Sequence, residues 1–338
     1  MPKRKNPVVA APYAALTPEC LLDAVETTGL RCDGRISALN SYENRVYQVW
    51  LESDTAGDSI IAKFYRPQRW SRAAILEEHA YALALAAAEL PVVAPLAFAG
   101  RTLHEHGGFL LALYPRQGGR TPEFEDEETL RWLGRFIARM HAIGALADFE
   151  ARPAIGWKEF GEEPVRYLLD HDFVPADLRV AYESTVLDVL ERVKQRWREA
   201  GQFATLRLHG DCHAGNILWT DPNGPHFVDL DDARMGPAVQ DLWMWLDGAR
   251  ETQQRQLAAI VAGYREFHDF NPAQLALIEP LRTLRMVHYA GWLARRWADP
   301  AFPRSFPFFN TQRYWQDHIL ALREQAAALD EPPLELER

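Results

Sequence analysis

The sequence has little cysteine, no long hydrophobic run and no excess of basic residues. Its three cysteines, Cys20, Cys32 and Cys212, form no CxxC pair, which argues against a structural zinc site and favours a reducing compartment. No run of about eighteen apolar residues occurs, and the basic N-terminus lacks the apolar core of a signal peptide. We therefore predict a cytoplasmic protein. The net charge of -10 argues against a protein that mainly neutralises nucleic-acid phosphates.

The composition is that of an ordinary globular protein, and the chain is long enough for two lobes. Of its 338 residues, 48% are hydrophobic and 25% are charged, so each lobe can bury a core of its own. A Gly- and Pro-rich stretch at residues 115–120 marks the boundary between them. We predict a flexible tail over residues 1–15, a first lobe over residues 16–115 and a second lobe over residues 116–338.

The segment with the clearest candidate catalytic and metal-binding residues lies in the second lobe. Residues 206–219 are predicted as a strand, a loop and a second strand, and residues 226–232 as the strand that returns. Residues 221–224 join these last two strands, and their Asn-Gly step favours a tight hairpin turn. The loop and the returning strand are therefore expected to lie close together.

Three side chains of this motif can hold a metal ion or move a proton. Asp211 and Asn216 lie at the two ends of the loop, and Asp229 lies on the returning strand. Magnesium prefers a few oxygen ligands and keeps some of its waters, so we predict Asn216 and Asp229 as its ligands. Asp211 then remains to orient and deprotonate an incoming alcohol. The Asp-x-x-x-x-Asn spacing is typical of the catalytic loop of phosphoryl-transfer enzymes.

Other interpretations of the same loop remain open. A polar turn beside a buried hairpin would need no chemistry at all. Cys212 could be a nucleophile, although its side chain should alternate away from that of Asp211 and no dedicated base is evident. His209, Asp211 and His213 could also ligate a hydrolytic metal ion if the loop were extended.

A second candidate group lies in the first lobe. The strand at residues 60–65 carries Lys63 among apolar residues, where a lysine either protects an edge strand from aggregation or holds nucleotide phosphates. A helix predicted over residues 72–90 brings Glu78 close to its packed side, and a buried carboxylate needs a cation such as Lys63. Kinases fix their phosphate-binding lysine with such a pair. Glu77 is the alternative partner, and periodicity alone does not choose between the two glutamates.

The remaining elements follow from hydrophobic periodicity. Strands are also predicted at residues 46–51, 96–99 and 109–114, with a turn at residues 54–58. Beyond the linker the pattern is mostly helical, with helices at residues 129–143, 175–200, 253–268, 278–297 and 312–329, and an aromatic- and Pro-rich loop at residues 300–309. The linker backbone is where an adenine ring would meet amide and carbonyl groups.

The segment after the magnesium-binding motif is short. Only eleven residues separate Asp229 from Asp241, which leaves no room for a long, phosphorylatable activation segment. A helix is predicted to begin at residues 239–243. Asp241 could cap this helix or brace the catalytic loop.

Together these motifs resemble a known family. HGDCHAGN at residues 209–216, with the VDLDD segment, is similar to the aminoglycoside phosphotransferase and choline kinase branch of the protein-kinase-like fold. LNSYENRVYQV, IAKFYRPQRW, ILEEHAYAL and RRWADPAFP, in this order from Leu39 onward, resemble more closely the bacterial stress response kinases. The resemblance implies an α+β, two-lobed protein-kinase-like fold, with a small, mainly antiparallel β N-lobe with helices and a larger, mostly helical C-lobe.

The resemblance also implies an activity. It implies a kinase, dependent on ATP and Mg²⁺, that transfers the γ-phosphoryl group to serine and threonine hydroxyls of proteins in a bacterial stress response. By position it points to Asp211 as the proton acceptor and to Asn216 and Asp229 as magnesium ligands. It also supports Lys63 with Glu78 as the pair that holds the nucleotide phosphates.

The resemblance further implies that Ser41, in the turn over the phosphates, contacts ATP. The turn at residues 39–47 contains no glycine, so the glycine-rich loop of ordinary protein kinases is absent. Ser41 and backbone amides would then have to bind the ATP phosphates in place of that loop.

The acceptor is the least determined part of this prediction, because the fold and the loop are shared by kinases of sugars, amino alcohols and antibiotics. Asp231, Asp232 and Glu279 could receive a cationic small substrate or a basic peptide. A nucleotide-binding module without catalysis is a further alternative, although it predicts a missing catalytic group and none is missing here. We expect ATP and protein substrates as partners, no nucleic acid, no membrane, and a monomer.

Overall fold

The computed structural model describes residues 11–52, 58–124, 126–221 and 224–336. The chain forms two compact units, and each unit combines separate segments of the sequence. The first contains Met1–Arg72, Pro95–Arg116 and Leu293–Phe309, and the second contains Ala73–Ala94, Gln117–Trp292 and Asn310–Arg338. The first unit therefore includes a segment from near the C-terminus, which the division predicted at residue 115 does not anticipate.

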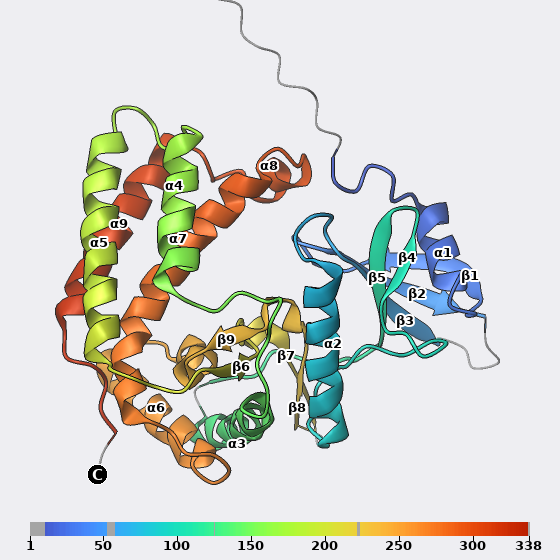
Figure 1. The fold of residues 1–338 in the computed structure, drawn as a ribbon, viewed down its shortest axis with the longest axis horizontal. Coiled ribbons are helices and arrows are strands. Elements are labelled where there is room, and N and C mark those ends of the chain that lie inside the picture. Colours follow the sequence, from blue (N-terminus) through green and yellow to red (C-terminus); the bar gives the residue numbers. More distant parts are fainter. Residues whose placement is uncertain (1–10, 53–57, 125, 222–223, 337–338) are drawn as a thin grey trace, which may run out of the picture. The chain divides into compact units, whose positions relative to one another are not determined.

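A five-stranded antiparallel sheet forms the centre of the first unit (Figure 1). Its strands are β1 (Cys32–Ala38), β2 (Arg45–Leu51), β3 (Ser59–Phe64), β4 (His104–His106) and β5 (Phe109–Pro115), in the spatial order β1-β2-β3-β5-β4. Every second residue of β3 from Ile60 to Phe64 points into the core, as the period of a half-buried strand requires. β3 lies between β2 and β5 and is therefore a central strand.

Helix α1 (Pro18–Glu26) packs against this sheet through Leu21 and Val25. Thr17 caps the helix by accepting the backbone N–H of Cys20 at 3.2 Å. The Thr-Pro-Glu sequence at residues 17–19 predicts a helix with Thr as its cap that runs to Gly29. The helix forms with this cap and ends at Glu26.

The N-terminal segment reaches the same unit. Residues 1–10 of the predicted tail lie outside the described part of the chain, but Tyr13 is described and packs on the sheet. Its ring stacks on Phe109 with the centroids 6.0 Å apart, and its hydroxyl lies 3.2 Å from the backbone oxygens of Glu43 and of Phe64. The end of the predicted tail is thus bound to the sheet around Tyr13.

One predicted strand is wrong. Residues 96–99 form no strand, because only Leu96 bonds to β5, through its N–H to Leu113, and Ala99 and Gly100 then turn with positive φ angles. Strand β4 at His104–His106 pairs with β5 instead. The turn predicted at residues 54–58 lies outside the described residues except for Asp58.

The second unit is mainly helical, with two small antiparallel pairs of strands (Figure 1). The pairs are β6 (Leu206–Leu208) with β9 (Arg234–Gly236) and β7 (Ile217–Thr220) with β8 (Gly224–Phe227). Its helices are α2 (Arg72–Ala87), α3 (Glu127–Gly144), α4 (Glu163–Asp170), α5 (Arg179–Glu199), α6 (Arg250–Tyr264), α7 (Ile278–Arg296) and α9 (Gln312–Asp330), of which α2 begins and α7 ends in the first unit. No helix of the described residues has the length and apolar character needed to cross a membrane.

Two glycines allow α3 and α6 to pack very closely. A Cβ atom added to Gly134 on α3 would lie 2.2 Å from the backbone oxygen of Ile260, and one added to Gly263 on α6 would lie 2.0 Å from that of Arg131. Side chains at these positions would force the helices apart. The apolar side of α3 predicted from its periodicity, from Leu130 to Met140, is fully buried in the core of this unit.

Three further differences concern short elements. The helix predicted to begin at residues 239–243 is a pair of 3₁₀ turns, Ala238–Asp241 and Trp243–Trp245. The loop predicted at residues 300–309 contains helix α8 (Ala301–Ser305). The hairpin β7–β8 forms, but β8 ends at Phe227, so the strand predicted over residues 226–232 is wrong beyond that residue and Asp229 lies two residues after the strand. Pro222 and Asn223 of the hairpin turn lie outside the described residues.

The fold makes stability depend on pH through His318 on α9. This side chain stacks on Tyr314 and lies beside Tyr182 and Trp315, and burial lowers its pKa to about 4. Because the unfolded chain binds the proton more readily, the stability of the folded state falls as the pH drops from about 6.5 towards 4. The loss from this group is about 3 kcal/mol.

We expect His318→Phe, which keeps an aromatic ring in the same stack, to remove most of this dependence. Urea unfolding of both proteins at pH 7 and pH 4.5 measures it. An equal loss of unfolding free energy in wild type and variant would contradict the assignment.

Candidate active site

The loop predicted to be catalytic starts at the end of β6, and hydrogen bonds to Asp241 hold its first two residues in place. The fully buried carboxylate of Asp241 accepts the backbone N–H groups of His209 and Gly210, both at 2.8 Å, and lies 3.0 Å from Nε2 of His141. Burial by itself would raise the pKa of Asp241, but the hydrogen bond and charge of His141, the charge of His209 and the N–H of Gly210 outweigh it and lower this pKa. Asp241 therefore stays ionised and braces the loop, and it does not cap a helix.

Gly210 brings this loop against the segment that follows β8. Its φ angle is +84°, and an added Cβ atom would lie 2.2 Å from the backbone oxygen of Asp232. Both the backbone conformation and the lack of space require glycine here. The backbone oxygen of Gly210 also accepts the side-chain amide of Gln240 at 2.9 Å.

Asp211, the residue after Gly210, lies between the guanidinium of Arg285 and the imidazole of His213. Oδ1 of Asp211 contacts a guanidinium nitrogen of Arg285 on α7, and Oδ2 lies 3.6 Å from Nε2 of His213. The side chain of Asp211 is 25% exposed, so a substrate can reach it. The partner Arg285 was not identified from the sequence, since an arginine on a long helix carries no pattern that marks it.

His213 is neutral and its tautomer follows from its contacts. Burial lowers the pKa of His213, against the opposite effect of Asp211. Its Nδ1 accepts the backbone N–H of Gly215 at 2.9 Å, so the single proton of the neutral ring is on Nε2. That proton faces Asp211.

Asn216 and Asp229 come together through the backbone. The Asn216 side chain donates to the backbone oxygen of Asp211 at 2.9 Å, and its own backbone oxygen accepts the N–H of Val228 at 3.0 Å. Asp229 is the next residue, is exposed, and has a left-handed conformation with φ 61° and ψ 65°. Such a conformation costs on the order of 1–3 kcal/mol and is common at functional sites.

The residues present suit magnesium. An amide oxygen on Asn216 and an exposed carboxylate on Asp229 are hard oxygen donors, and the charges of Asp211 and Asp229 both act on His213. The described residues contain no group of three or more His, Cys, Asp or Glu side chains able to hold a metal ion. The alternative hydrolytic centre of His209, Asp211 and His213 is therefore not formed.

The nucleophile interpretation of Cys212 is also wrong. Its side chain is fully buried, and burial is the main cause that raises the pKa of its thiol well above the usual range. A buried thiol that stays protonated is a poor nucleophile.

In the first unit, Lys63 lies on the central strand β3, so protection of a sheet edge does not explain it. The side chain is buried, and its Nζ lies 5.1 Å from the centre of the Tyr65 ring. Its contact with nucleotide phosphates stays a prediction.

The two glutamates on α2 have different partners. Glu78 is buried and forms an ion pair of 2.8 Å with Arg152, whereas Glu77 accepts the backbone N–H groups of Glu150 and Ala151. Glu78 is thus the buried carboxylate that the sequence analysis expected, but the sequence did not indicate Arg152 as its partner. The pairing of Glu78 with Lys63 stays a prediction.

Arg152 connects α2 to the segment behind Asp229. Its guanidinium also donates to the backbone oxygens of Ala74, Asp231 and Ala233 at 2.7–2.9 Å. No signal in the sequence marks this residue, because these hydrogen-bond partners and Glu78 lie 74 to 81 positions away.

The glycine-free turn at Ser41 is held by an ion network. Ser41 Oγ donates to the backbone oxygen of Asn44 at 3.1 Å, and the Asn44 side chain accepts the backbone N–H of Arg66. The buried Arg66 guanidinium in turn pairs with Glu43 at 3.0 Å and Asp299 at 2.8 Å. Side-chain ion pairs therefore fix this turn.

A cavity of about 310 Å³ adjoins the same turn. It is lined by residues of the turn and its flanking strands, including Ser41 and Tyr47, and by Phe302 and Ser305 of α8. The contact of Ser41 with ATP stays a prediction.

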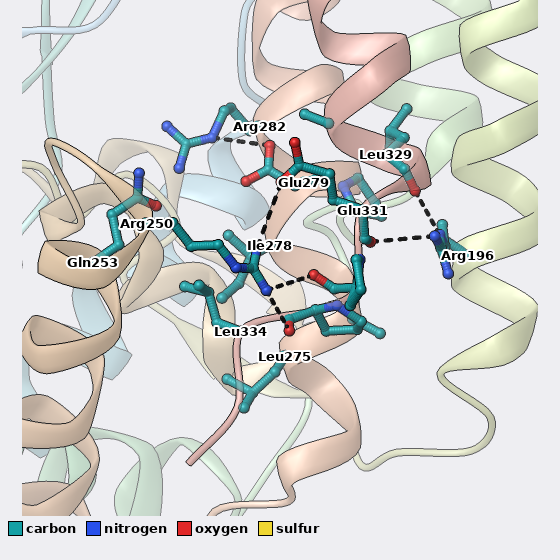
Figure 2. Close-up of a pocket in the computed structure, with 15 residues that line it drawn as sticks. Arg196, Arg250, Gln253, Leu275, Ile278, Glu279, Arg282, Leu329, Glu331 and Leu334 are labelled. Carbon is teal, nitrogen blue, oxygen red and sulfur yellow. Dashed lines mark hydrogen bonds and ion pairs between the residues drawn. The ribbon is translucent and has the colours of Figure 1, made fainter. Parts of the chain in front are cut away.

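A second cavity, of about 330 Å³, lies in the helical unit and contains none of the predicted site residues (Figure 2). Arg250 there donates to the backbone oxygens of Pro332 and Pro333, and Arg196 to that of Leu329, so these arginines hold the C-terminal segment (Figure 2). Glu279 lines this cavity as well.

The fold and the site define a phosphotransferase of the kinase-like type. The chain belongs to the phosphotransferase enzyme family, which it matches over residues 35–278. It is 47% identical to stress response kinase A of Escherichia coli strain K12 over 324 residues, which are 96% of this chain and 97% of that protein. It is 46% identical to serine/threonine protein kinase RdoA of Salmonella typhimurium strain LT2 over the same share of both chains. The family predicted from the motifs is confirmed.

Solved structures of kinases have the same fold. Amicoumacin kinase hAmiN, in complex with AMP-PNP, Ca²⁺ and Ami, matches with a TM-score of 0.69 at 20% identity, over 93% of this chain and 94% of that chain. A microcompartment-associated aminopropanol kinase matches with a TM-score of 0.67 at 18% identity, over 91% of this chain and 95% of that chain. The predicted α+β fold class is confirmed.

Proposed function

We propose that this protein is a serine/threonine protein kinase of a bacterial stress response, which transfers the γ-phosphoryl group of ATP to protein hydroxyls with magnesium. The observation that supports the proposal is the loop braced by Asp241, in which Asp211 bonds Asn216 and Asn216 bonds Val228, the neighbour of Asp229. The relatives named above as kinases support the acceptor class. The AMP-PNP in the amicoumacin kinase structure supports ATP as the donor.

We propose a role for each predicted residue of the site. Asp211 accepts the proton of the acceptor hydroxyl, and its carboxylate is oriented by Arg285 and His213. Asn216 and Asp229 would hold magnesium, which when bound neutralises charge on the phosphates. Ser41 and Lys63, with Glu78, would hold the nucleotide.

The experiment that tests the proposal supplies ATP labelled on its γ-phosphate to the enzyme and a generic protein rich in serine and threonine. We expect labelled phosphoserine and phosphothreonine with magnesium, loss of labelling when a chelator removes the metal, and recovery when magnesium is returned. Labelled amino alcohols or sugars with no labelled protein would favour a small-molecule kinase instead. Labelling that persists in the chelator would contradict the magnesium site.

Two further proposals concern the cellular setting. We propose a cytoplasmic location, because Cys20, Cys32 and Cys212 are all free thiols, as a reducing compartment favours. We also propose that the enzyme acts as a monomer, which sedimentation of the purified protein measures.

A further inference from the structure

Arg285 lies beside the carboxylate of Asp211, to which the hydroxyl of an acceptor must also bind. It lies on an exposed face of α7, its side chain is 46% exposed, and its guanidinium contacts Oδ1 of Asp211. A hydroxyl that gives its proton to Asp211 must come within about 2.6–3.2 Å of a carboxylate oxygen. The acceptor oxygen therefore lies within a few ångströms of a permanent positive charge.

An acceptor hydroxyl that binds the second oxygen of Asp211, Oδ2, stays close to the charge of Arg285. Oδ2 lies 3.6 Å from Nε2 of His213, which is beyond hydrogen-bond distance. A carboxylate can accept about four hydrogen bonds, so an acceptor hydroxyl can bind Asp211 without displacing Arg285. Arg285 then remains next to the bound acceptor.

The sequence analysis expected three acidic residues to receive a cationic substrate. Glu279 accepts the Gln325 amide at 2.6 Å and pairs with Arg282 at 3.3 Å, and Asp232 pairs with Arg234 at 3.2 Å. The Asp231 side chain is only 3% exposed. The acidic residues that the sequence analysis expected to receive a cationic substrate thus have other partners or little access.

We infer that Arg285 determines acceptor specificity: it disfavours acceptors with a positive charge close to the hydroxyl and favours serine or threonine beside a carboxylate or phosphate group. An ammonium group about 5 Å from a guanidinium, in surroundings between water and protein interior, is disfavoured on the order of tenfold or more. The effect is a difference between substrates of opposite charge. This inference rests on the proposed protein kinase function and names the substrate class of the same site.

The test uses three serine peptides that differ only in the residues next to the serine, which are aspartate, alanine or lysine. For wild type, we expect kcat/KM to be roughly tenfold or more higher for the aspartate peptide than for the lysine peptide, with the ratio decreasing as salt is raised. Arg285→Ala should bring the ratio near one, Arg285→Glu should reverse it, and Arg285→Lys should keep it. The ratio within each variant is informative even if contact with Asp211 changes the overall rate.

Arg313→Ala is the matched control, because Arg313 is an exposed arginine on α9 that pairs with Asp317 in the same helix. It should leave the ratio unchanged. Equal use of the three peptides by wild type, or a ratio that survives in Arg285→Glu, would overturn the inference while leaving the protein kinase function intact. Phosphorylation of amino alcohols in place of every peptide and protein would contradict both.

Discussion

Asp211→Asn is expected to lower phosphate transfer from ATP to protein on the order of a hundredfold or more, because the amide cannot accept the proton of the acceptor hydroxyl. The substitution keeps the size of the side chain. Nucleotide binding should survive, since neither predicted magnesium ligand is changed. Labelled γ-phosphate transfer measures the rate, and fluorescence titration with a nucleotide analogue measures binding.

Asp317→Asn serves as the control for this experiment. Asp317 is an exposed carboxylate on α9 that pairs with Arg313 at 3.5 Å, so its loss should leave the transfer rate unchanged. If Asp211→Asn retained most of the activity, the assignment of the base would be wrong. If it also lost nucleotide binding, the loop would have a structural role in place of the catalytic one.

Asp241→Ala is expected to lower the free energy of unfolding by about 3–5 kcal/mol, the usual effect of breaking a buried charged group away from its partners. The substitution leaves the N–H groups of His209 and Gly210, and the ring of His141, without their shared acceptor. Activity should fall as well, because the backbone that positions Asp211 loses its brace.

Urea unfolding followed by circular dichroism measures the loss. Asp188→Ala is the control: Asp188 forms a half-exposed pair with Arg192 on α5, and its removal should cost at most about 0.5 kcal/mol. Because the pKa of Asp241 is lowered in the folded state, its contribution is present above pH 4 and disappears as the pH falls below this value. An Asp241→Ala protein with wild-type stability would contradict the brace.

The sequence analysis predicted the site residues from their chemistry and local spacing. Asp211 and Asn216 are five positions apart in one loop, and a hairpin returns the chain to Asp229, so their proximity follows from short-range geometry. The alternation of β3 and the periodicity of α3 likewise depend on neighbours along the chain, and both elements form as predicted.

The partners of these residues could not be predicted in the same way. Arg285 lies 74 positions from Asp211, and Arg152 lies 74 positions from Glu78. Each contact depends on how separate elements pack, and an isolated arginine in a loop or on a helix carries no local pattern. The same limit left the two roles of Asp241 open.

By itself, the sequence predicted which side chains would hold magnesium and accept a proton, because residue types and spacing within a loop are local properties. The tertiary structure excluded the sheet-edge interpretation of Lys63, since the order of strands places β3 at the centre of the sheet. The tertiary structure also shows that Asp241 braces the loop and that Arg285 contacts the carboxylate of Asp211. The physical reason is the same in each case: burial, ion pairing and hydrogen bonding join groups that only the packing of distant segments brings within reach.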